Sequence, residues 1–257
     1  MKILTLNINS IRAHIESFMD ILRNGEYDTI LVQELKVETA NFPYNLLDEY
    51  GYNIKVFGQK SWNGVATFSK FSIEDITMGL PTYPDANARF LECVIDGHIR
   101  LINVYMPNGD CIESPKFPYK LDWMNAFTKY ISRFTDSEEP VIIGGDFNVA
   151  INDRDIWNPK NYIGSSISAP QARAIMEDWL KIGWIDMWRT LHPDKNDYTW
   201  YGYRGRDTVG NNQGLRLDYF LCNKSAEKIV KNCEIDINPR LADKPTDHCG
   251  LMLEISD

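Results

Sequence analysis

The segment VIIGGDFN at residues 141–148 constrains the fold of this chain more than any other stretch. Three β-branched apolar residues followed by two glycines are typical of a buried strand that ends in a turn. Because side chains alternate along an extended chain, Asp146 and Asn148 lie on one face of that strand end. The glycines allow a ligand phosphate or a neighbouring loop to approach the backbone closely. A capped strand end with local Asp and Asn turn bonds is the simpler alternative.

A second polar strand end is predicted near the N-terminus. Residues 2–7 and 29–32 are predicted strands, and the helically spaced apolar residues between them follow Ser10, a good N-cap. This strand–helix–strand order predicts a crossover that places Asn7 and Glu34 at neighbouring strand ends. Magnesium takes oxygen ligands from carboxylates, water and phosphate, so Glu34 beside Asn7 is a candidate site for it. A solvated loop glutamate is the alternative.

The remaining elements follow from turn residues and apolar spacing. We expect strands at 52–57, 64–68, 90–95, 100–104, 216–221 and 251–255, a hairpin at Asp96-Gly97, and amphipathic helices at 118–134 and 169–182. Residues 151–168 form a long polar segment without regular periodicity. A loop of this length in a folded domain favours a functional surface over a simple connection.

Several residues outside these two strand ends also suggest chemistry. Residues 198–206 mix aromatics, glycines and arginines, which suits phosphate binding and base stacking, or else a glycine-kinked strand with solvated arginines. Asp218 lies among core residues and needs a buried partner. The pair Asp247-His248 is typical of acid/base machinery or of a capped turn. Tyr105 is either a core ring or a phenol directed at a phosphate oxygen.

Composition narrows the class of protein. No linker, repeat or low-complexity run divides the 257 residues, so we expect one domain spanning 1–257. The net charge of −9 argues against attraction of the whole protein to nucleic acid or anionic membranes, although a local basic surface remains compatible with it. Five scattered cysteines without a C-x-x-C pair suggest reduced thiols. Without a signal-peptide core or a long apolar run, we expect a soluble, cytoplasmic monomer with no membrane partner.

Taken together, the motifs resemble the exonuclease III family of abasic-site DNA repair nucleases, within the endonuclease/exonuclease/phosphatase superfamily. The matching segments are 6–13, 32–36, 64–66, 103–108, 144–149, 215–218 and 246–249, in the family's order and across essentially the whole chain. The resemblance implies an α/β four-layer sandwich, in which two packed mixed β-sheets are flanked by helices. It also implies an active site at the end of the sandwich where strand ends converge.

The resemblance implies a role for each matching residue. Glu34 matches the principal Mg²⁺ carboxylate, with Mn²⁺ able to substitute, and Asn7 and Asp247 match residues near the metal. Asp146 matches the residue assigned to proton transfer, and Asn148 the one that positions water and phosphate.

Further matches concern the phosphate and the DNA. His248 matches the histidine that contacts the scissile phosphate, Asp218 the aspartate that orients it, and Tyr105 a phosphate-binding tyrosine. Trp200 and Leu215 match positions that line the pocket for an extruded abasic sugar, although many abasic endonucleases of the family have tryptophan in place of Leu215. The expected contacts to substrate also include Asn9, Lys36, Asn108, Arg204 and Arg216.

The implied function is a Mg²⁺-dependent DNA repair nuclease that cuts duplex DNA 5′ to abasic sites and removes nucleotides from 3′ ends. A phosphodiesterase or phosphatase acting on a lipid or small phosphoester is the alternative, because it would share Asn7, Glu34, Asp146, Asn148 and His248. A catalytically inactive nucleic-acid-binding module is a third class, which the complete acidic set disfavours.

Overall fold

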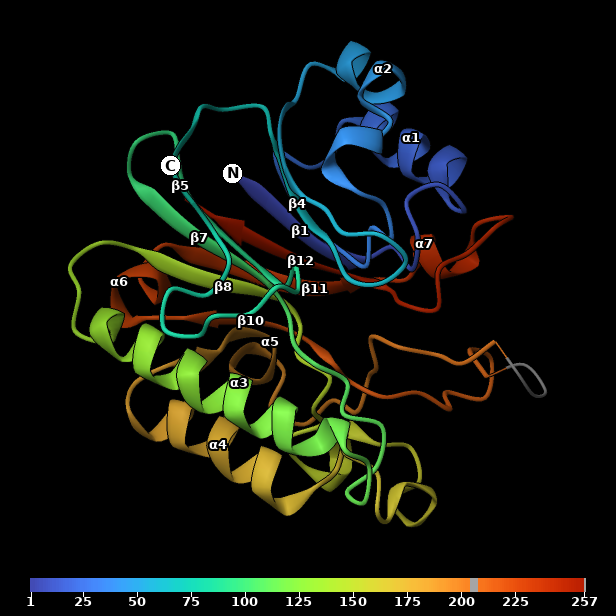
Figure 1. Cartoon of the computed structure of the whole chain (residues 1–257), viewed down its shortest axis with the longest axis vertical. Helices are drawn as coiled ribbons and strands as arrows, with labels where there is room; N and C mark the ends of the chain where they lie inside the picture. Colours follow the sequence, from blue (N-terminus) through green and yellow to red (C-terminus); the bar gives the residue numbers. More distant parts are fainter. Residues whose placement is uncertain (204–207, 257) are drawn as a thin grey trace.

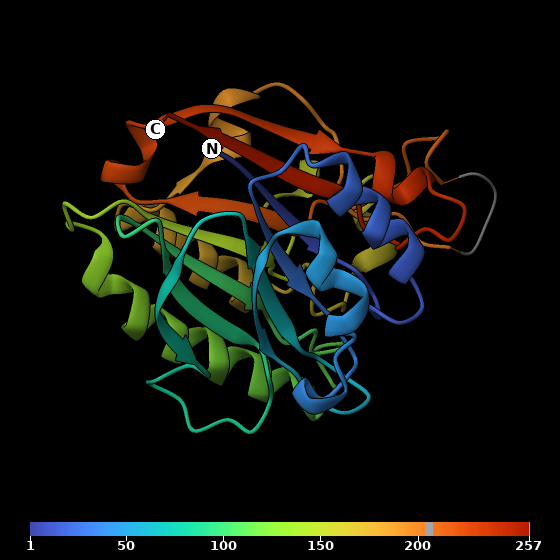
Figure 2. The ribbon, with the colours of Figure 1, turned by 90° about the horizontal axis from the view of Figure 1, so that it is seen from above.

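The computed structural model describes residues 1–203 and 208–256 and consists of two six-stranded mixed sheets that pack face to face between helices (Figure 1). The strand order is β11-β12-β1-β2-β4-β3 in the first sheet and β5-β6-β7-β8-β10-β9 in the second. Helices α1 and α2 cover the outer face of the first sheet, and α3 and α4 that of the second (Figure 2). The predicted four-layer α/β sandwich is therefore confirmed.

The first sheet contains β1 (Lys2–Asn7), β2 (Thr29–Gln33), β3 (Asn53–Phe57), β4 (Val65–Ser69), β11 (Val230–Asp236) and β12 (Gly250–Ile255). The second contains β5 (Ile73–Met78), β6 (Phe90–Ile95), β7 (Ile99–Tyr105), β8 (Val141–Asp146), β9 (Ile185–Asp186) and β10 (Asp218–Cys222). The α-helices are α1 (Ile15–Asn24), α2 (Tyr44–Leu47), α3 (Lys116–Ile131), α4 (Pro170–Lys181), α5 (Met187–Leu191), α6 (Lys224–Glu227) and α7 (Asn238–Leu241). The 3₁₀ helices are η1 (Thr39–Asn41), η2 (Asp48–Tyr50), η3 (Ser132–Phe134), η4 (Asp153–Asp155) and η5 (Pro159–Tyr162). No helix of the described ranges has both the length and the apolar character needed to cross a membrane.

Most predicted elements are present, including the parallel β1–β2 crossover and the antiparallel β6–β7 hairpin. The predicted N-cap at Ser10 is wrong, because α1 begins at Ile15 and Ser10 has a φ of 96°. The Ser10 N–H instead donates to the carbonyl of Glu34 at 2.8 Å, which binds this segment to the end of β2. Strands β5, β9 and β11 were not predicted; β5 and β11 are amphipathic and incompletely buried, and β9 has two residues.

Strand β8 brings the candidate site residues into register. Asp146 is the last residue of β8, and it lies opposite Tyr105 of the parallel strand β7 and Asp218 of the antiparallel strand β10. In the other sheet Asn7 of β1 pairs with Gln33 of β2, so Glu34 follows at the neighbouring strand end. The sheets pack through a shared apolar cluster, and both therefore present polar strand ends to the same region.

The glycines before Asp146 serve the packing of the protein itself. A Cβ on Gly145, whose φ is +152°, would lie 1.9 Å from the carbonyl oxygen of Val104 in the neighbouring strand. A Cβ on Gly144 would lie 2.6 Å from the ring of Phe220 and 2.7 Å from Leu31 of the other sheet. The expectation that a phosphate or loop occupies this space is thus corrected, because strand β7 and the opposite sheet already fill it.

Gly145→Ala should destabilise the fold by about 3 kcal/mol or more, since it combines a backbone clash with a positive φ. Gly97→Ala is the matched control, because Gly97 also has a positive φ but has nothing within 4 Å of the added Cβ. Urea denaturation should give a clearly larger loss of unfolding free energy for Gly145→Ala. Equal losses in the two variants would show that strand proximity does not explain this glycine.

Candidate active site

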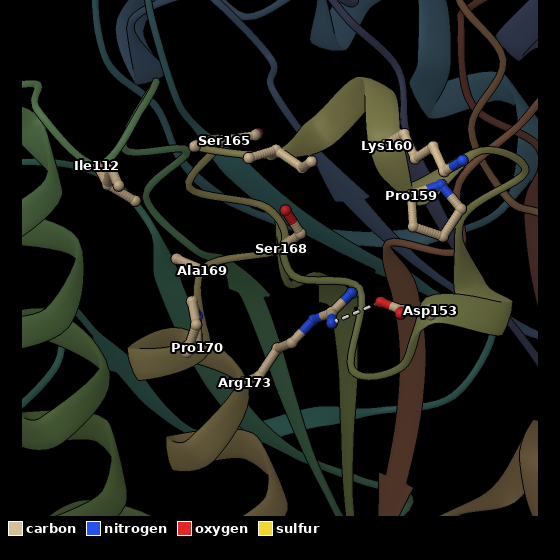
Figure 3. Close-up of a pocket in the computed structure, with 11 residues that line it drawn as sticks. Ile112, Asp153, Pro159, Lys160, Ser165, Ser168, Ala169, Pro170 and Arg173 are labelled. Atoms are coloured by element: carbon tan, nitrogen blue, oxygen red, sulfur yellow. Dashed lines mark hydrogen bonds and ion pairs between the residues drawn. The ribbon is translucent and has the colours of Figure 1, made fainter.

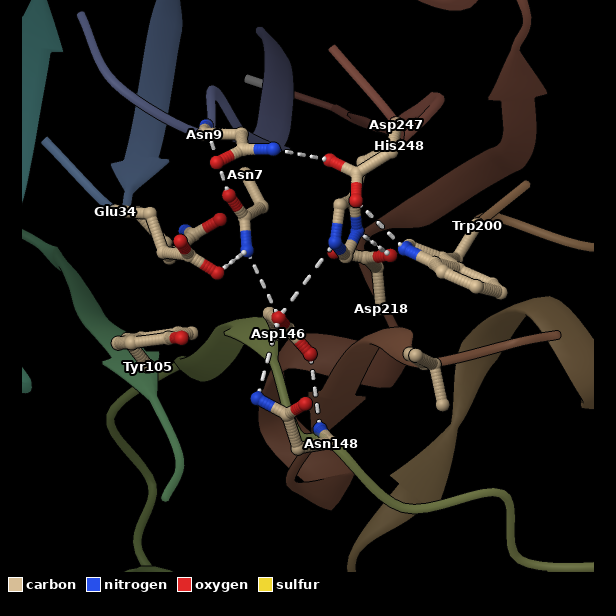
Figure 4. A network of polar contacts seen from close by, with 12 residues as sticks. Asn7, Asn9, Glu34, Tyr105, Asp146, Asn148, Trp200, Asp218, Asp247 and His248 are labelled. Carbon is tan, nitrogen blue, oxygen red and sulfur yellow. Dashed lines mark hydrogen bonds and ion pairs between the residues drawn. The ribbon is translucent and has the colours of Figure 1, made fainter. Parts of the chain in front are cut away.

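Asp146 lies at the centre of a polar network that joins the two sheets (Figure 4). The side-chain amide of Asn7 donates to Glu34 Oε1 and to Asp146 Oδ2, each at 2.9 Å. The backbone N–H of Asn148 donates to Asp146 Oδ1 at 2.9 Å, and its side-chain amide lies 3.3 Å from Oδ2. The Asn7 amide therefore links the ends of β1, β2 and β8, and the Asp146 residue that it binds is 1% exposed.

A buried aspartate–histidine pair lies beside Asp146. His248 Nδ1 is 2.9 Å from Asp218 Oδ2, and Nε2 is 3.8 Å from Asp146 Oδ2. Burial alone would lower the pKa of His248, but Asp218 and Asp146 outweigh it and raise that pKa to about 10. Burial raises the pKa of Asp146 to about 7, against the opposing effect of the His248 charge. At neutral pH the site thus contains an imidazolium and a carboxyl group able to gain or lose a proton.

Glu34 is held in its ionised form. Burial would raise its pKa, but the Lys36 ammonium at 2.9 Å and a hydrogen bond from Asn7 together lower it. Burial, with the charges of Glu34 and Asp146, raises the pKa of Tyr105 well above its ordinary value. The Tyr105 phenol therefore stays protonated and can donate a hydrogen bond to a phosphate oxygen.

The donor set suits a magnesium ion held mainly by one carboxylate. Across residues 1–203 and 208–256, no group of three or more His, Cys, Asp or Glu side chains could hold a metal ion. Asn7 turns its NH₂ toward Glu34, and its oxygen accepts the Asn9 N–H at 3.0 Å. The oxygens of Asp247 accept from Asn9 and from Trp200 Nε1, each at 2.9 Å.

Asn7 and Asp247, the two residues expected near the metal, both orient other side chains through these hydrogen bonds, and their part in holding a metal stays a prediction. Glu34 is ionised and has an ammonium group as its counter-charge, so its chemistry fits a cation that also binds water and phosphate.

Left-handed backbone conformations concentrate at this site. Asn9, Glu34, Lys36 and Asn148 have φ values of 49°, 55°, 53° and 51°. Such conformations are unfavourable for non-glycine residues and persist where surrounding contacts enforce them. Here the Leu35 and Lys36 N–H groups donate to the carbonyls of Gly64 and Asn63 at the entry of β4. These cross-strand bonds direct the Glu34 side chain into the site.

Most of the predicted substrate residues surround the network. Lys36 donates to the Asn9 side chain, and Asn108 Nδ2 donates to Asn148 Oδ1 at 2.9 Å. Trp200 is partly buried and packs on an apolar cluster of Ala150, Ile156, Leu215 and Leu217. Arg204 and Arg206 lie outside the described residues.

The predicted phosphate contact of Arg216 is corrected by its burial. The side chain is 1% exposed, and it forms 2.8 Å ion pairs with Asp155 through Nε and with Asp186 through Nη1. Its guanidinium also lies 4.4 Å from the ring centroid of Tyr219. Two acidic residues from distant segments therefore bind Arg216 inside the protein, where a DNA backbone cannot reach it.

Sequence reasoning missed a cavity of about 440 Å³ beside Glu34 and Tyr105. It missed Arg89 in particular, whose Nη1 donates to the Tyr105 carbonyl and whose Nε donates to the Tyr119 hydroxyl, each at 3.2 Å. The other residues that line it include Gln59, Trp62, Asn63 and Asn87. No motif marks these positions, which come from two separate segments, 59–63 and 87–89.

The long polar segment forms a different cavity of about 410 Å³, between residues 153–170 and the start of α4 (Figure 3). An ion pair of 2.8 Å between Arg173 and Asp153 lies at its edge. Among the predicted site residues that the structure describes, none lines this cavity.

The sandwich, the acidic network and the aspartate–histidine pair together define an enzyme of the phosphodiesterase class. Residues 4–248 match the Endonuclease/Exonuclease/phosphatase family, and the chain belongs to this family as an exodeoxyribonuclease III / AP endonuclease type nuclease. It is 31% identical to "Exodeoxyribonuclease III" of Haemophilus influenzae, over 99% of both chains.

Two solved structures extend the comparison over 100% of both chains. An AP endonuclease from Archaeoglobus fulgidus is 33% identical, with a TM-score of 0.95. A 3′ phosphatase from Neisseria, bound to product DNA hairpin, is 32% identical, with a TM-score of 0.94. The resemblance seen in the sequence is confirmed.

Asp218→Asn should lower the pKa of His248 from about 10, because the variant removes the carboxylate that contributes most to that raised value. The imidazole should then lose its proton at a lower pH than in the wild type, which an NMR titration of the histidine ring protons can follow. Asp247→Asn is the control, since Asp247 contributes less to the same pKa. A shift of similar size in both variants would contradict the dominant role of Asp218.

Arg216→Ala should lower the free energy of unfolding by about 3–5 kcal/mol, because it leaves the buried Asp186 without its cation and leaves Asp155 with Arg189 alone. Lys116→Ala, at an exposed ion pair with Asp110, should change it by less than about 1 kcal/mol. Chemical denaturation measures both values. If the Arg216→Ala variant is as stable as the wild type but binds DNA more weakly, Arg216 contacts the phosphate backbone as the sequence predicted.

Proposed function

We propose that this nuclease is Mg²⁺-dependent, cuts duplex DNA 5′ to abasic sites and removes nucleotides from 3′ ends. The observation that carries the proposal is the network in which Asn7 joins the ionised Glu34 to the buried Asp146, beside the Asp218–His248 pair. Phosphodiester hydrolysis needs charge neutralisation on the phosphate and proton transfer at the reacting oxygens. The network contains groups for both tasks, since His248 is charged and Asp146 can gain or lose a proton.

Glu34 would hold the magnesium ion, which when bound supplies Lewis-acid stabilisation of the charged phosphate. The remaining steps belong to side chains of the chain itself. The His248 imidazolium and the Tyr105 phenol donate hydrogen bonds to non-bridging oxygens. Asp146, whose pKa lies near 7, transfers the proton, and the Asn148 carboxamide orients water and phosphate. Asp218 keeps His248 charged and oriented.

Abasic selectivity would arise at the apolar cluster beside the site. Trp200 lies between His248 and Leu215 in the backbone pairing, and its indole N–H is bound to Asp247. A sugar without a base is extruded from the duplex at lower cost, and an apolar pocket of limited size excludes nucleotides that retain a base. The cluster around Leu215 and Leu217 supports such a pocket.

The choice of DNA over a lipid or small phosphoester rests on likeness over the full chain to DNA-acting nucleases. The catalytic network alone does not separate these substrates, because its chemistry acts on any phosphodiester. Lys36 and Asn108 lie at the rim of the network, where they support a DNA backbone contact. The monomeric state and the cytoplasmic location stay predictions.

The decisive assay compares four substrates with Mg²⁺, with Mn²⁺ and with excess EDTA. These are a duplex with one abasic analogue, a duplex with recessed 3′ ends, the same duplex carrying 3′ phosphates, and bis(p-nitrophenyl) phosphate. We expect metal-dependent cleavage of the first two. The duplex with 3′ phosphates tests for the 3′ phosphatase activity named for the Neisseria relative. Hydrolysis of bis(p-nitrophenyl) phosphate alone would favour an enzyme that acts on small phosphoesters. Full activity in EDTA would contradict the metal requirement.

Asp146→Asn and Glu34→Gln should each lower kcat by about 10²- to 10⁴-fold with the fold retained, because each removes a group that acts on charge or protons in the transition state. Asp153→Asn, on the exposed edge of the other cavity, is the matched control and should keep wild-type turnover. Gel-shift binding should persist in Asp146→Asn. If kcat is unchanged in Asp146→Asn or in Glu34→Gln, the role proposed for the replaced residue belongs to another residue.

A further inference from the structure

Lys120 is a fully buried lysine that the proposed chemistry does not use. It lies near the start of α3 and is 0% exposed. Its ammonium donates to the backbone carbonyls of Asn148 at 2.7 Å, Asn108 at 3.1 Å and Ser166 at 3.3 Å. Three N–H donors therefore meet three acceptors. Among the residues described, no carboxylate lies within ion-pair distance of the ammonium, so the carbonyls are its partners.

The three carbonyls come from three segments that border the active site. Asn108 lies in the connection from β7 to α3, Asn148 lies two residues after the end of β8, and Ser166 lies near the end of the long polar segment. The loop also encloses the lysine stem, since a Cβ on Gly109 would lie 2.9 Å from Lys120 Cδ. The Ser166 hydroxyl donates to the same Asn108 carbonyl at 2.5 Å. Lys120 is thus the point at which these segments are joined.

The side chains of the two asparagines face the reacting groups. Asn108 Nδ2 donates to Asn148 Oδ1, and Asn148 in turn contacts Asp146. A displacement of either backbone carbonyl would move the carboxamide attached to the same residue. Burial of an ammonium is costly, and burial lowers the pKa of Lys120 to about 7 against the opposing effect of Asp146.

We propose that Lys120 is a positioning residue for phosphodiester hydrolysis, which acts by holding the backbone of Asn148 and Asn108 so that their carboxamides face the phosphate. The inference rests on the proposed function, because it assigns Asn148 a role in orienting water and phosphate. Lys120 itself does not touch the substrate. Replacing Lys120 should therefore lower kcat, and the size of this decrease should depend on the presence of the Asn148 side chain.

The first variant is Lys120→Met, which keeps an unbranched apolar stem and removes all three donors. We expect kcat to fall by about 10-fold or more while KM changes by less than about 3-fold, the pattern of an interaction that matters in the transition state. Lys129→Met is the control, because Lys129 lies in the same helix, is exposed and is not among the residues that line the cavity beside Glu34. Circular dichroism and thermal melting report the folded fraction. A kcat per folded molecule equal to wild type would overturn the proposal.

A double-mutant cycle with Asn148→Ala separates positioning from scaffolding. If Lys120 acts through Asn148, Lys120→Met should lower kcat by less than about 2-fold in the Asn148→Ala background, because coupled residues are not additive. The same large factor in both backgrounds would overturn the proposal. If Lys120→Met does not fold, the cycle is run with Lys120→Arg, which keeps a buried cation, and the same two outcomes decide.

The cycle is measured on the abasic duplex and on bis(p-nitrophenyl) phosphate. A wild-type protein that hydrolyses only the small ester contradicts the DNA function, and the cycle on that ester still decides the role of Lys120. If the wild type cleaves a substrate but Lys120 and Asn148 show no coupling on it, only the proposed role of Lys120 is contradicted. A wild-type protein inactive on both substrates overturns both proposals.

Discussion

The burial of the Asp146 carboxylate is the constraint on which the site depends. A carboxylate removed from water must find hydrogen-bond donors or positive charge, and here these come from three separate segments. Asn7 reaches it from the first sheet, Asn148 from the turn after β8, and His248 from the loop before β12. Satisfying one buried group therefore requires the ends of both sheets to meet, and the same contacts assemble the catalytic side chains.

Two carboxylates in this site differ in protonation because their surroundings differ. Glu34 has an ammonium 2.9 Å away and stays ionised, which suits a cation ligand. Asp146 is more deeply buried and lies near other acidic groups, so its pKa rises to about 7 despite His248. When their surroundings give two neighbouring carboxyl groups different pKa values, one group can serve an electrostatic role and the other can transfer protons. The tertiary contacts, not the residue types, produce this division.

Buried cations have two distinct uses in this protein. Arg216 is paired with two carboxylates and lies against Trp188 and Tyr219, away from the network, so it stabilises the fold. Lys120 binds backbone carbonyls of residues whose side chains enter the network. Both side chains look alike in the sequence, as basic residues near motif positions. Their partners, which only the structure shows, distinguish the two.

The sequence by itself determined the order of the main strands and the set of polar strand ends, because apolar periodicity and local turn chemistry are encoded within short segments. The sandwich architecture followed from the resemblance of the combined motifs to the exonuclease III family. Contacts between distant segments required the tertiary structure: the burial of Arg216 by Asp155 and Asp186, the Arg89 cavity and the carbonyl cage of Lys120. The orientation of Asn7 and the left-handed backbone of Glu34 also depend on neighbouring strands. Side-chain partners and pKa values are properties of three-dimensional surroundings, and a linear pattern does not contain them.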